Sequence, residues 1–165
     1  MQVTLQVNGR EYTRQIEPRL LLVHFLRDEL GLTGTHWGCD TSNCGSCVVL
    51  MDGEPAKSCT VLTATASQYA ISTVEGLELD GRLDPLQEAF TAEHGLQCGF
   101  CTPGMLMTAR ALLDARAAQG VTEPLTDEEI REAISGQICR CTGYATIVRS
   151  IRRAAEYPTE EVAGR

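Results

Sequence analysis

Eight cysteines that fall into two separate groups constrain this chain of 165 residues more than any other feature of its sequence. In the first group, four residues separate Cys39 from Cys44, two separate Cys44 from Cys47, and eleven separate Cys47 from Cys59. This is the spacing of plant-type [2Fe–2S] ferredoxins. A zinc ribbon also uses close cysteine pairs, but it needs two of them, and here the fourth cysteine stands alone. The first group therefore predicts a [2Fe–2S] cluster.

The surroundings of the first group suggest how a cluster is held. We expect Gly38 and Gly45 to let backbone N–H groups approach the sulfurs, where they stabilise the negative charge of a cluster. We expect Cys59 to approach from the second strand of a hairpin, predicted over residues 57–61. The loop between a helix and the first strand of that hairpin would then wrap the cluster.

The second group consists of two close pairs that each precede a predicted helix. Its members are Cys98, Cys101, Cys139 and Cys141. Helix N-termini offer free N–H groups and the positive end of the helix dipole, which suits an anionic cluster. Taken alone, this group fits zinc and a [2Fe–2S] cluster equally well. A Rieske centre is not favoured, because none of the histidines sits beside a cysteine pair in the required way.

The first 76 residues have the pattern of a small mixed α+β domain. Apolar and polar residues alternate before Asn8 and Gly9, a pair that favours a type I′ hairpin turn. We expect strands at 3–7 and 10–16, a helix over 20–30, a second hairpin from strands at 47–51 and 57–61, and a strand at 70–74. Residues 76–81 have few core positions and are predicted to be a linker.

Beyond the linker the hydrophobic period becomes helical. The predicted helices cover 84–93, 103–119, 126–135 and 144–157, with Pro158 as a stop and a loose tail from Thr159. Short loops between four helices indicate a small bundle, and one cysteine pair per helix pair hints at internal two-fold symmetry. The fold class is therefore α+β, with an N-terminal domain over 1–76 and an all-α domain over 82–158.

Composition excludes several classes of function. The net charge of −8 argues against nucleic-acid binding, which needs clustered Lys and Arg. No basic segment followed by an apolar one opens the chain, and the longest apolar run, Cys47 to Met51, is too short for a transmembrane segment. We expect a cytoplasmic protein, where cysteines are more often metal ligands than disulfides.

No other residue pattern indicates catalysis. The sequence contains neither a Gly-rich phosphate loop nor a Ser/His/Asp arrangement, so no catalytic residue is predicted. A structural role is favoured for His24, His36 and His94, and Trp37 is expected to pack beside the first cysteine loop.

Three motifs together are more specific than either cysteine group. They are the runs Gly38–Cys47, Gln97–Gly104 and Cys139–Tyr144. Over residues 1 to 157 the chain closely resembles the small subunit of the molybdenum hydroxylases, the xanthine oxidase family.

That resemblance implies a β-grasp ferredoxin-like domain followed by a four-helix bundle with pseudo-two-fold symmetry. It implies a [2Fe–2S] cluster in each cysteine group. It also implies partners: a molybdopterin-binding large subunit that oxidises substrate with water as the oxygen source, and an FAD-binding medium subunit, assembled as a dimer of heterotrimers. The small subunit would carry electrons from the first partner to the second. Gln97 and Cys141 would lie against the pterin.

Within the family, the loop Cys39–Ser42 looks most like that of aerobic carbon monoxide dehydrogenases, whose large subunit oxidises carbon monoxide at a molybdenum–copper site. Related small subunits serve aldehyde, purine and N-heterocycle hydroxylases, which remain alternatives. A free-standing ferredoxin shuttle is a further alternative, although a shuttle needs only one cluster.

Overall fold

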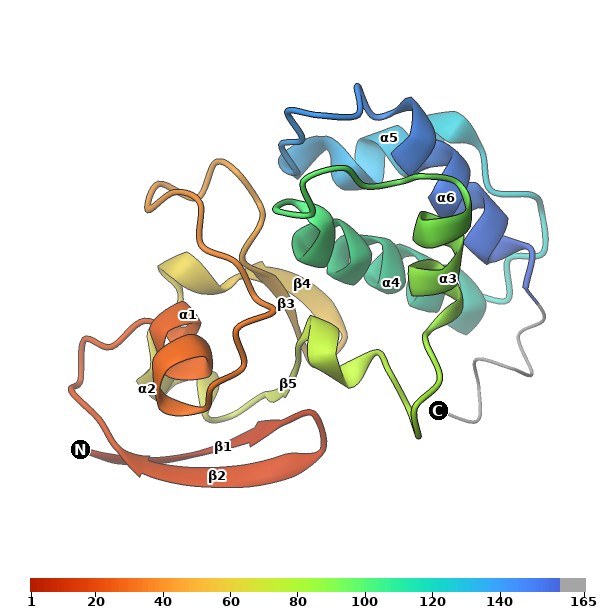
Figure 1. Cartoon of the computed structure of the whole chain (residues 1–165). Helices are drawn as coiled ribbons and strands as arrows, with labels where there is room; N and C mark the ends of the chain where they lie inside the picture. The colour runs from red at the N-terminus through yellow and green to blue at the C-terminus, as the bar shows by residue number, and fades with distance from the viewer. Residues whose placement is uncertain (158–165) are drawn as a thin grey trace.

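The computed structural model describes residues 1–157. An N-terminal part built on a sheet lies beside a C-terminal helical part (Figure 1). The predicted stop at Pro158, the end of the predicted 82–158 domain and the predicted tail from Thr159 lie outside the described residues. Among the described residues, no helix is long and apolar enough to cross a membrane.

Within residues 1–157 the sheet has five strands in the order β2-β1-β5-β3-β4. They are β1 (Gln2–Val7), β2 (Arg10–Gln15), β3 (Val48–Met51), β4 (Glu54–Lys57) and β5 (Ala70–Ser72). Strands β1 and β5 run parallel, and the other neighbouring pairs are antiparallel. The sheet is therefore mixed, with the two hairpins at its edges and β5 between them.

The first hairpin confirms the prediction from its turn residues. Asn8 and Gly9 have φ values of 49° and 74°, as a type I′ turn requires, and Val7 pairs with Arg10 directly across the turn. Every second side chain of β1 is buried, so this strand presents one face to the core.

The second hairpin differs from the predicted one. Its second strand, β4, begins three residues earlier than expected, because the two-residue turn at Asp52 and Gly53 pairs Met51 with Glu54. Pro55 is tolerated there because β4 lies at the sheet edge, where an N–H is not needed. The strand predicted over 57–61 is wrong: after Lys57 the chain forms the 3-10 turn η2 (Ser58–Thr60) and then the short helix α2 (Thr63–Ala66).

The helix predicted over 20–30 forms, but it begins as a short α-helical segment and continues as a wider π-helical turn. Helix α1 (Leu22–His24) continues as the π-helical turn η1 (Phe25–Glu29), in which the Leu30 N–H donates to the Phe25 carbonyl at 3.1 Å. It ends at Gly31, whose φ of 72° suits a residue just past a helix. Its apolar side chains form a core with β1, β5 and Val49 of β3.

The helical part contains α3 (Pro85–Ala92), α4 (Thr102–Ala118), α5 (Asp127–Ala133) and α6 (Ala145–Ala155), with 3-10 turns η3 (Val74–Gly76) and η4 (Ile134–Gly136). Helix α6 packs on α3 and α5, and α4 also touches both. The linker predicted over 76–81 leads into a small turn in which Leu79 and Arg82 pair.

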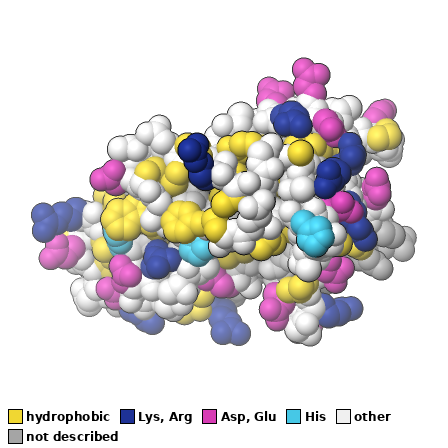
Figure 2. All heavy atoms as spheres, turned by 45° about the horizontal axis from the view of Figure 1, so that its top comes forward, with side chains coloured by type: hydrophobic (Ala, Val, Ile, Leu, Met, Phe, Trp, Pro, Cys, Tyr) yellow, Lys and Arg dark blue, Asp and Glu magenta, His cyan; other side chains and the backbone are white. Residues whose placement is uncertain are grey.

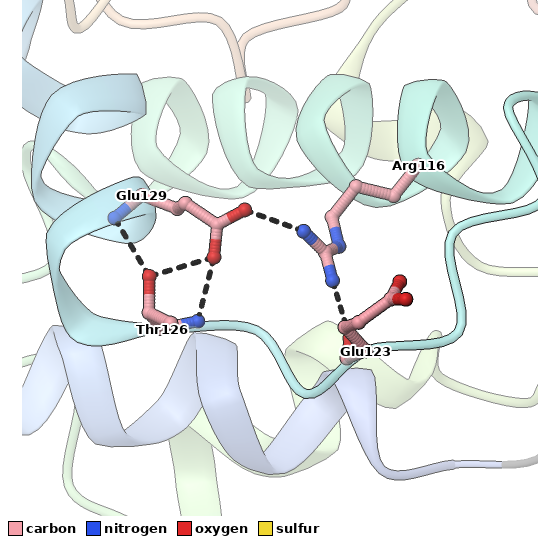
Figure 3. A network of polar contacts seen from close by, with 4 residues as sticks. All are labelled: Arg116, Glu123, Thr126 and Glu129. Carbon is pink, nitrogen blue, oxygen red and sulfur yellow. Dashed lines mark hydrogen bonds and ion pairs between the residues drawn. The ribbon is translucent and has the colours of Figure 1, made fainter.

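Side-chain caps fix where two of these helices begin. Asp84 and Gln87 form a capping box at α3, and Thr126 and Glu129 form the predicted one at α5. Arg116 of α4 donates to Glu129 at 2.6 Å and also reaches the Glu123 carbonyl (Figure 3). One network thus joins the end of α4 to the start of α5.

Strand β3 explains how the two parts share a core. Val49 packs in the N-terminal core, whereas Val48 and Leu50 belong to the same hydrophobic cluster as Met105 of α4 and Leu86 of α3. A strand that is apolar on both faces is expected to be covered on both. Helix α4 therefore covers one face of the sheet and fixes the cysteine loops of the two parts relative to each other.

Candidate metal centres

The first cysteine loop connects η1 to β3 and folds back on its own sulfurs. The Cys44 N–H donates to Cys39 Sγ at 3.3 Å, and Ser46 Oγ lies 3.2 Å from Cys44 Sγ. Cys59 lies on η2, so it approaches from a turn just past the edge strand and not from a strand as predicted. The Ser58 hydroxyl donates to the Cys47 carbonyl at 2.7 Å and holds this turn against the start of β3.

The four thiols of the first group have contrasting environments. Backbone N–H groups, chiefly that of Cys44, lower the pKa of the Cys39 thiol to about 6. Burial raises the pKa of the Cys47 thiol to about 11. The Cys59 backbone N–H opposes this rise, and the Cys59 thiol adds to it. The backbone around Cys39 thus stabilises a thiolate by itself, whereas a thiolate at the buried Cys47 needs a bound metal to stabilise it.

The second group assembles where α4 and α6 begin. Cys101 is the N-cap of α4, and Cys141 Sγ lies 3.4 Å from Cys98 Sγ. The Cys139 N–H donates to the Tyr144 hydroxyl at 2.9 Å, and Tyr144 takes a left-handed φ of 69° just before α6. The prediction that each pair lies directly before a helix is confirmed.

In the second group the exposed Cys98 and the buried Cys101 show the same contrast, whereas contact with the Cys98 thiol helps to raise the pKa of the exposed Cys141. The Phe100 N–H and then the Cys141 thiol lower the pKa of Cys98. Burial raises the pKa of Cys101 to about 12, and the neighbouring Cys139 contributes. Burial is the largest single influence on Cys139 and disfavours its ionisation. The Thr142 hydroxyl, 3.3 Å from its sulfur, the backbone N–H groups of Thr142 and Cys141 and the Cys101 thiol together outweigh burial, and the pKa of Cys139 is lowered.

Both groups present thiols in pairs, which fits a two-iron cluster. The contacts join Cys39 to Cys44 and Cys47 to Cys59 in the first group, and Cys98 to Cys141 and Cys101 to Cys139 in the second. Among the described residues no three or more His, Cys, Asp or Glu side chains converge as a single metal ion needs. A [2Fe–2S] cluster instead places two thiolates on each of two irons, so the donor set fits it.

The two cysteine loops touch one another through residues that the sequence did not single out. Phe100, between Cys98 and Cys101, lies where a side chain on Gly38 would be, 2.7 Å from that position, and its ring stacks on His36. Gln137 likewise fills the space beside Gly45. The two glycines therefore admit side chains of the helical part, in addition to any role toward the sulfurs.

Gln97, Cys98 and Cys141 reach the surface together. All three are exposed, and Gln97 adjoins Cys98 in sequence. Trp37, Leu96, Phe100 and Ile138, close to the cysteines in sequence, are also exposed. Hydrophobic side chains gather in a band across the face that includes the top of Figure 1 (Figure 2). Exposed hydrophobic patches are typical of surfaces that bind another molecule.

His24, His36 and Trp37 make contacts within the protein. His36 Nδ1 lies 2.8 Å from the Phe100 carbonyl, and His24 meets the Trp37 ring edge to face. His94 follows α3 with a left-handed φ of 55°. Lys57 and Gln137, by contrast, contact the first cysteine loop and gave no signal in the sequence, because their contacts come from distant segments.

Comparison with known proteins assigns both parts. Residues 5–72 match the family described as 2Fe-2S iron-sulfur cluster binding domain, and residues 73–152 match the family described as [2Fe-2S] binding domain. The chain therefore binds two [2Fe–2S] clusters, and the zinc alternative for the second group is set aside. Two such domains in one chain define an iron–sulfur electron-transfer protein.

The relatives narrow this class. The chain is 50% identical to caffeine dehydrogenase subunit gamma of Pseudomonas sp. (strain CBB1), over 98% of this chain and 93% of that one. It is 53% identical to the 6-hydroxypseudooxynicotine dehydrogenase complex subunit beta of Paenarthrobacter nicotinovorans, over 90% and 89%. The crystal structure of quinoline 2-oxidoreductase from Pseudomonas putida 86 superposes with a TM-score of 0.87 at 44% identity, covering 94% of each chain. The chain belongs to the small iron–sulfur subunits of the molybdenum hydroxylase family.

Proposed function

We propose that this chain passes electrons between two partner subunits of a molybdenum hydroxylase, through two [2Fe–2S] clusters held in series. The observation that carries this is the pairing of thiols in two groups whose loops touch each other. Each cluster exchanges one electron when bound, and the chain's own residues bind the irons and surround the sulfurs with N–H and hydroxyl donors.

The proposed ligands follow the thiol pairs. The first cluster is assigned to Cys39, Cys44, Cys47 and Cys59, and the second to Cys98, Cys101, Cys139 and Cys141. The Cys44 N–H, the Ser46 hydroxyl and the Thr142 hydroxyl, each 3.2–3.3 Å from a ligand sulfur, support this assignment because such donors stabilise the negative charge of a cluster.

The proposed architecture is two domains, over residues 1–76 and 82–158, the second a four-helix bundle with pseudo-two-fold symmetry. The two family matches, which meet between residues 72 and 73, support a boundary in this region. Cysteine pairs before α4 and before α6 support the symmetry, since each half would then present one pair at the start of one long helix.

The proposed partners are a molybdopterin-binding large subunit and an FAD-binding medium subunit, in a cytoplasmic dimer of heterotrimers. Gln97 and Cys141 are proposed to contact the pterin. Their exposure, beside the Cys98–Cys141 contact, supports this, because a Gln amide offers both a donor and an acceptor to the edge of a pterin. The exposed hydrophobic side chains near both loops suit burial against a partner.

The proposed substrate class is an N-heterocyclic aromatic compound, since relatives of high identity are named for caffeine, nicotine derivatives and quinoline. The loop Cys39–Ser42 favours carbon monoxide as a second candidate. This loop belongs to the electron-transfer chain and would not touch substrate. We therefore weigh the relatives more heavily, and carbon monoxide oxidation stays a prediction.

Purification of the native complex and a substrate panel test these proposals. Affinity capture of this chain is expected to bring down a molybdopterin chain and a flavin chain in equal amounts. The complex should then reduce a dye with quinoline, nicotine or caffeine, and carbon monoxide and an aldehyde serve as the comparison. Turnover of carbon monoxide alone would reverse the substrate proposal and leave the electron-transfer role intact.

The same purification also tests the alternative that the chain is a free-standing ferredoxin shuttle. A monomeric chain that captures neither partner and accepts electrons from several unrelated reductases would support a free-standing ferredoxin. The second cluster-binding part counts against this, because it adds a cluster that a shuttle does not need.

A further inference from the structure

Lys57 is the only lysine in the sequence, and it lies at the first cysteine loop. It ends the edge strand β4, and its side chain is half-buried. Its ammonium donates to the Ser42 carbonyl at 2.6 Å. Ser42 lies between Cys39 and Cys44 and has a left-handed φ of 60°, which non-glycine residues rarely adopt without support.

No carboxylate among the described residues neutralises the charge of Lys57. Within residues 1–157 its ammonium forms no ion pair, and the Ser42 carbonyl is its only hydrogen-bond acceptor there. A side chain on Gly136 would come within 3.7 Å of Nζ, so Lys57 also faces the η4 turn that leads to Cys139. One fixed positive charge therefore stands where the two cysteine loops approach each other.

Reduction of a [2Fe–2S] cluster adds one negative charge. A nearby cation that lacks a counter-ion favours the reduced state and raises the reduction potential, and partial burial strengthens this effect. Hydrogen bonds and charges around the sulfurs are the means by which a protein sets that potential.

We propose that Lys57 is a positioning residue with two effects on the first cluster: it holds Ser42 in its left-handed conformation, and its charge raises the reduction potential. The proposal rests on the assignment of the first cluster to the group Cys39 to Cys59. In the proposed direction of electron flow, a higher potential at the first cluster favours transfer from the second cluster to the first.

Three substitutions separate charge from hydrogen bonding. Lys57→Arg keeps the charge and a donor, Lys57→Gln keeps an amide donor without the charge, and Lys57→Met removes both. Arg14→Gln on β2 is the matched control, because this exposed arginine contacts only its near neighbours, the Thr13 carbonyl and the Tyr12 ring, among the described residues, and lies at the opposite sheet edge.

The test is a redox titration of the whole complex, followed by electron paramagnetic resonance of each reduced cluster. In Lys57→Gln we expect the equilibrium constant for electron transfer from the second cluster to the first to fall about tenfold, which for one electron is about 59 mV. The equilibrium constant in Lys57→Arg and in Arg14→Gln should stay within about twofold of the wild-type value. In Lys57→Met it should fall at least as far as in Lys57→Gln.

An unchanged first-cluster potential in both Lys57→Gln and Lys57→Met, with the cluster present, would overturn the proposal. So would an equal shift of both clusters, because the effect would then not be local. If the Gln and Met variants fail to assemble the cluster, Lys57→Arg decides: a potential far from the wild type there contradicts a role of the charge. Absence of a [2Fe–2S] signal that depends on Cys44 in the wild type would instead reject the ligand assignment itself.

Discussion

The backbone N–H of Ile138 donates to the carbonyl of Cys44 at 2.9 Å. Cys44 belongs to the first cysteine group, and Ile138 directly precedes Cys139 of the second. This hydrogen bond thus links Cys44 to Cys139 by a route of a few covalent bonds. Because a short bonded route couples redox centres better than a gap does, this contact can carry electrons between the two cluster sites. Phe100 packs against Gly38 and adds a second contact between the two loops.

The approach of Gly104 to Gly45 gives the first prediction. A Cβ on Gly104 would lie 2.2 Å from the Gly45 carbonyl oxygen, a backbone atom that cannot move aside. Gly104→Ala should therefore push α4 from the first cysteine loop and destabilise the protein by about 1–3 kcal/mol. The measurement is the urea midpoint for loss of visible cluster absorbance. Gly136→Ala is the control, since its Cβ would meet only Lys57 at 3.7 Å. Equal midpoints in the two variants would contradict the close contact.

Local features of the fold were predictable from the sequence. Asn8 and Gly9 specify a turn by their own conformational preference, and Thr126 and Glu129 cap α5 with their own side chains. The extent of β4 was not predictable in this way. Its start is set by pairing with β3, and Pro55 is acceptable only because β4 is an edge strand, which depends on the whole sheet.

In the candidate site, too, local features could be predicted from the sequence and contacts between distant segments could not. Cysteine spacing indicated both groups, because loops that bind a cluster keep their ligands close in sequence. The contacts of Phe100 with Gly38, Ile138 with Cys44 and Lys57 with Ser42 join segments far apart in the chain. The first two depend on α4 covering β3, and the third depends on the pairing of β4 with β3, so no pattern within one segment encodes them.

Thiol reactivity gives the second prediction. In the cluster-free chain at pH 7, Cys39, with a pKa of about 6, should be about nine-tenths thiolate, the reactive form. Cys47, buried and with a pKa of about 11, should remain a thiol. Iodoacetamide pulses read by peptide mass spectrometry should therefore label Cys39 first and Cys47 last. The rate at Cys39 should fall as the pH drops through 6, and cluster-loaded chain should resist labelling at both.

Equal labelling rates of the two cysteines at pH 7 would contradict this order. It would show that the first loop has no defined structure without its cluster.

The independence of the two clusters gives the third prediction. The Cys44→Ser variant should lose one electron paramagnetic resonance signal of the reduced protein and keep the other, because the second group has its own four cysteines at the starts of α4 and α6. Cys101→Ser should do the reverse. The wild type should contain about four irons and four sulfides per chain, and each variant about half of that. Loss of both signals from a folded variant would mean that the ligands are wrongly divided.

The direction of electron flow gives the last prediction. Cys98 and Cys141 are exposed and in contact, and Gln97 lies beside them, whereas Cys47 and Cys59 of the first group are buried. The second cluster can therefore come close to a cofactor on a partner surface. We expect the order molybdopterin, second cluster, first cluster, flavin.

Gln97→Ala should slow reduction of both clusters by substrate, because the amide that would bond the pterin is lost. Electron exchange between flavin and the first cluster should change little, since Gln97 is not part of the first loop. Leu96→Ala is a matched control: it also shortens an exposed side chain beside the loop but removes no hydrogen-bonding group. The deciding measurement is the magnetic coupling of molybdenum(V) to each reduced cluster, assigned with the Cys44→Ser and Cys101→Ser variants. Stronger coupling to the cluster that Cys44→Ser removes would reverse the order, and the exposed Cys98–Cys141 edge would then face the flavin subunit.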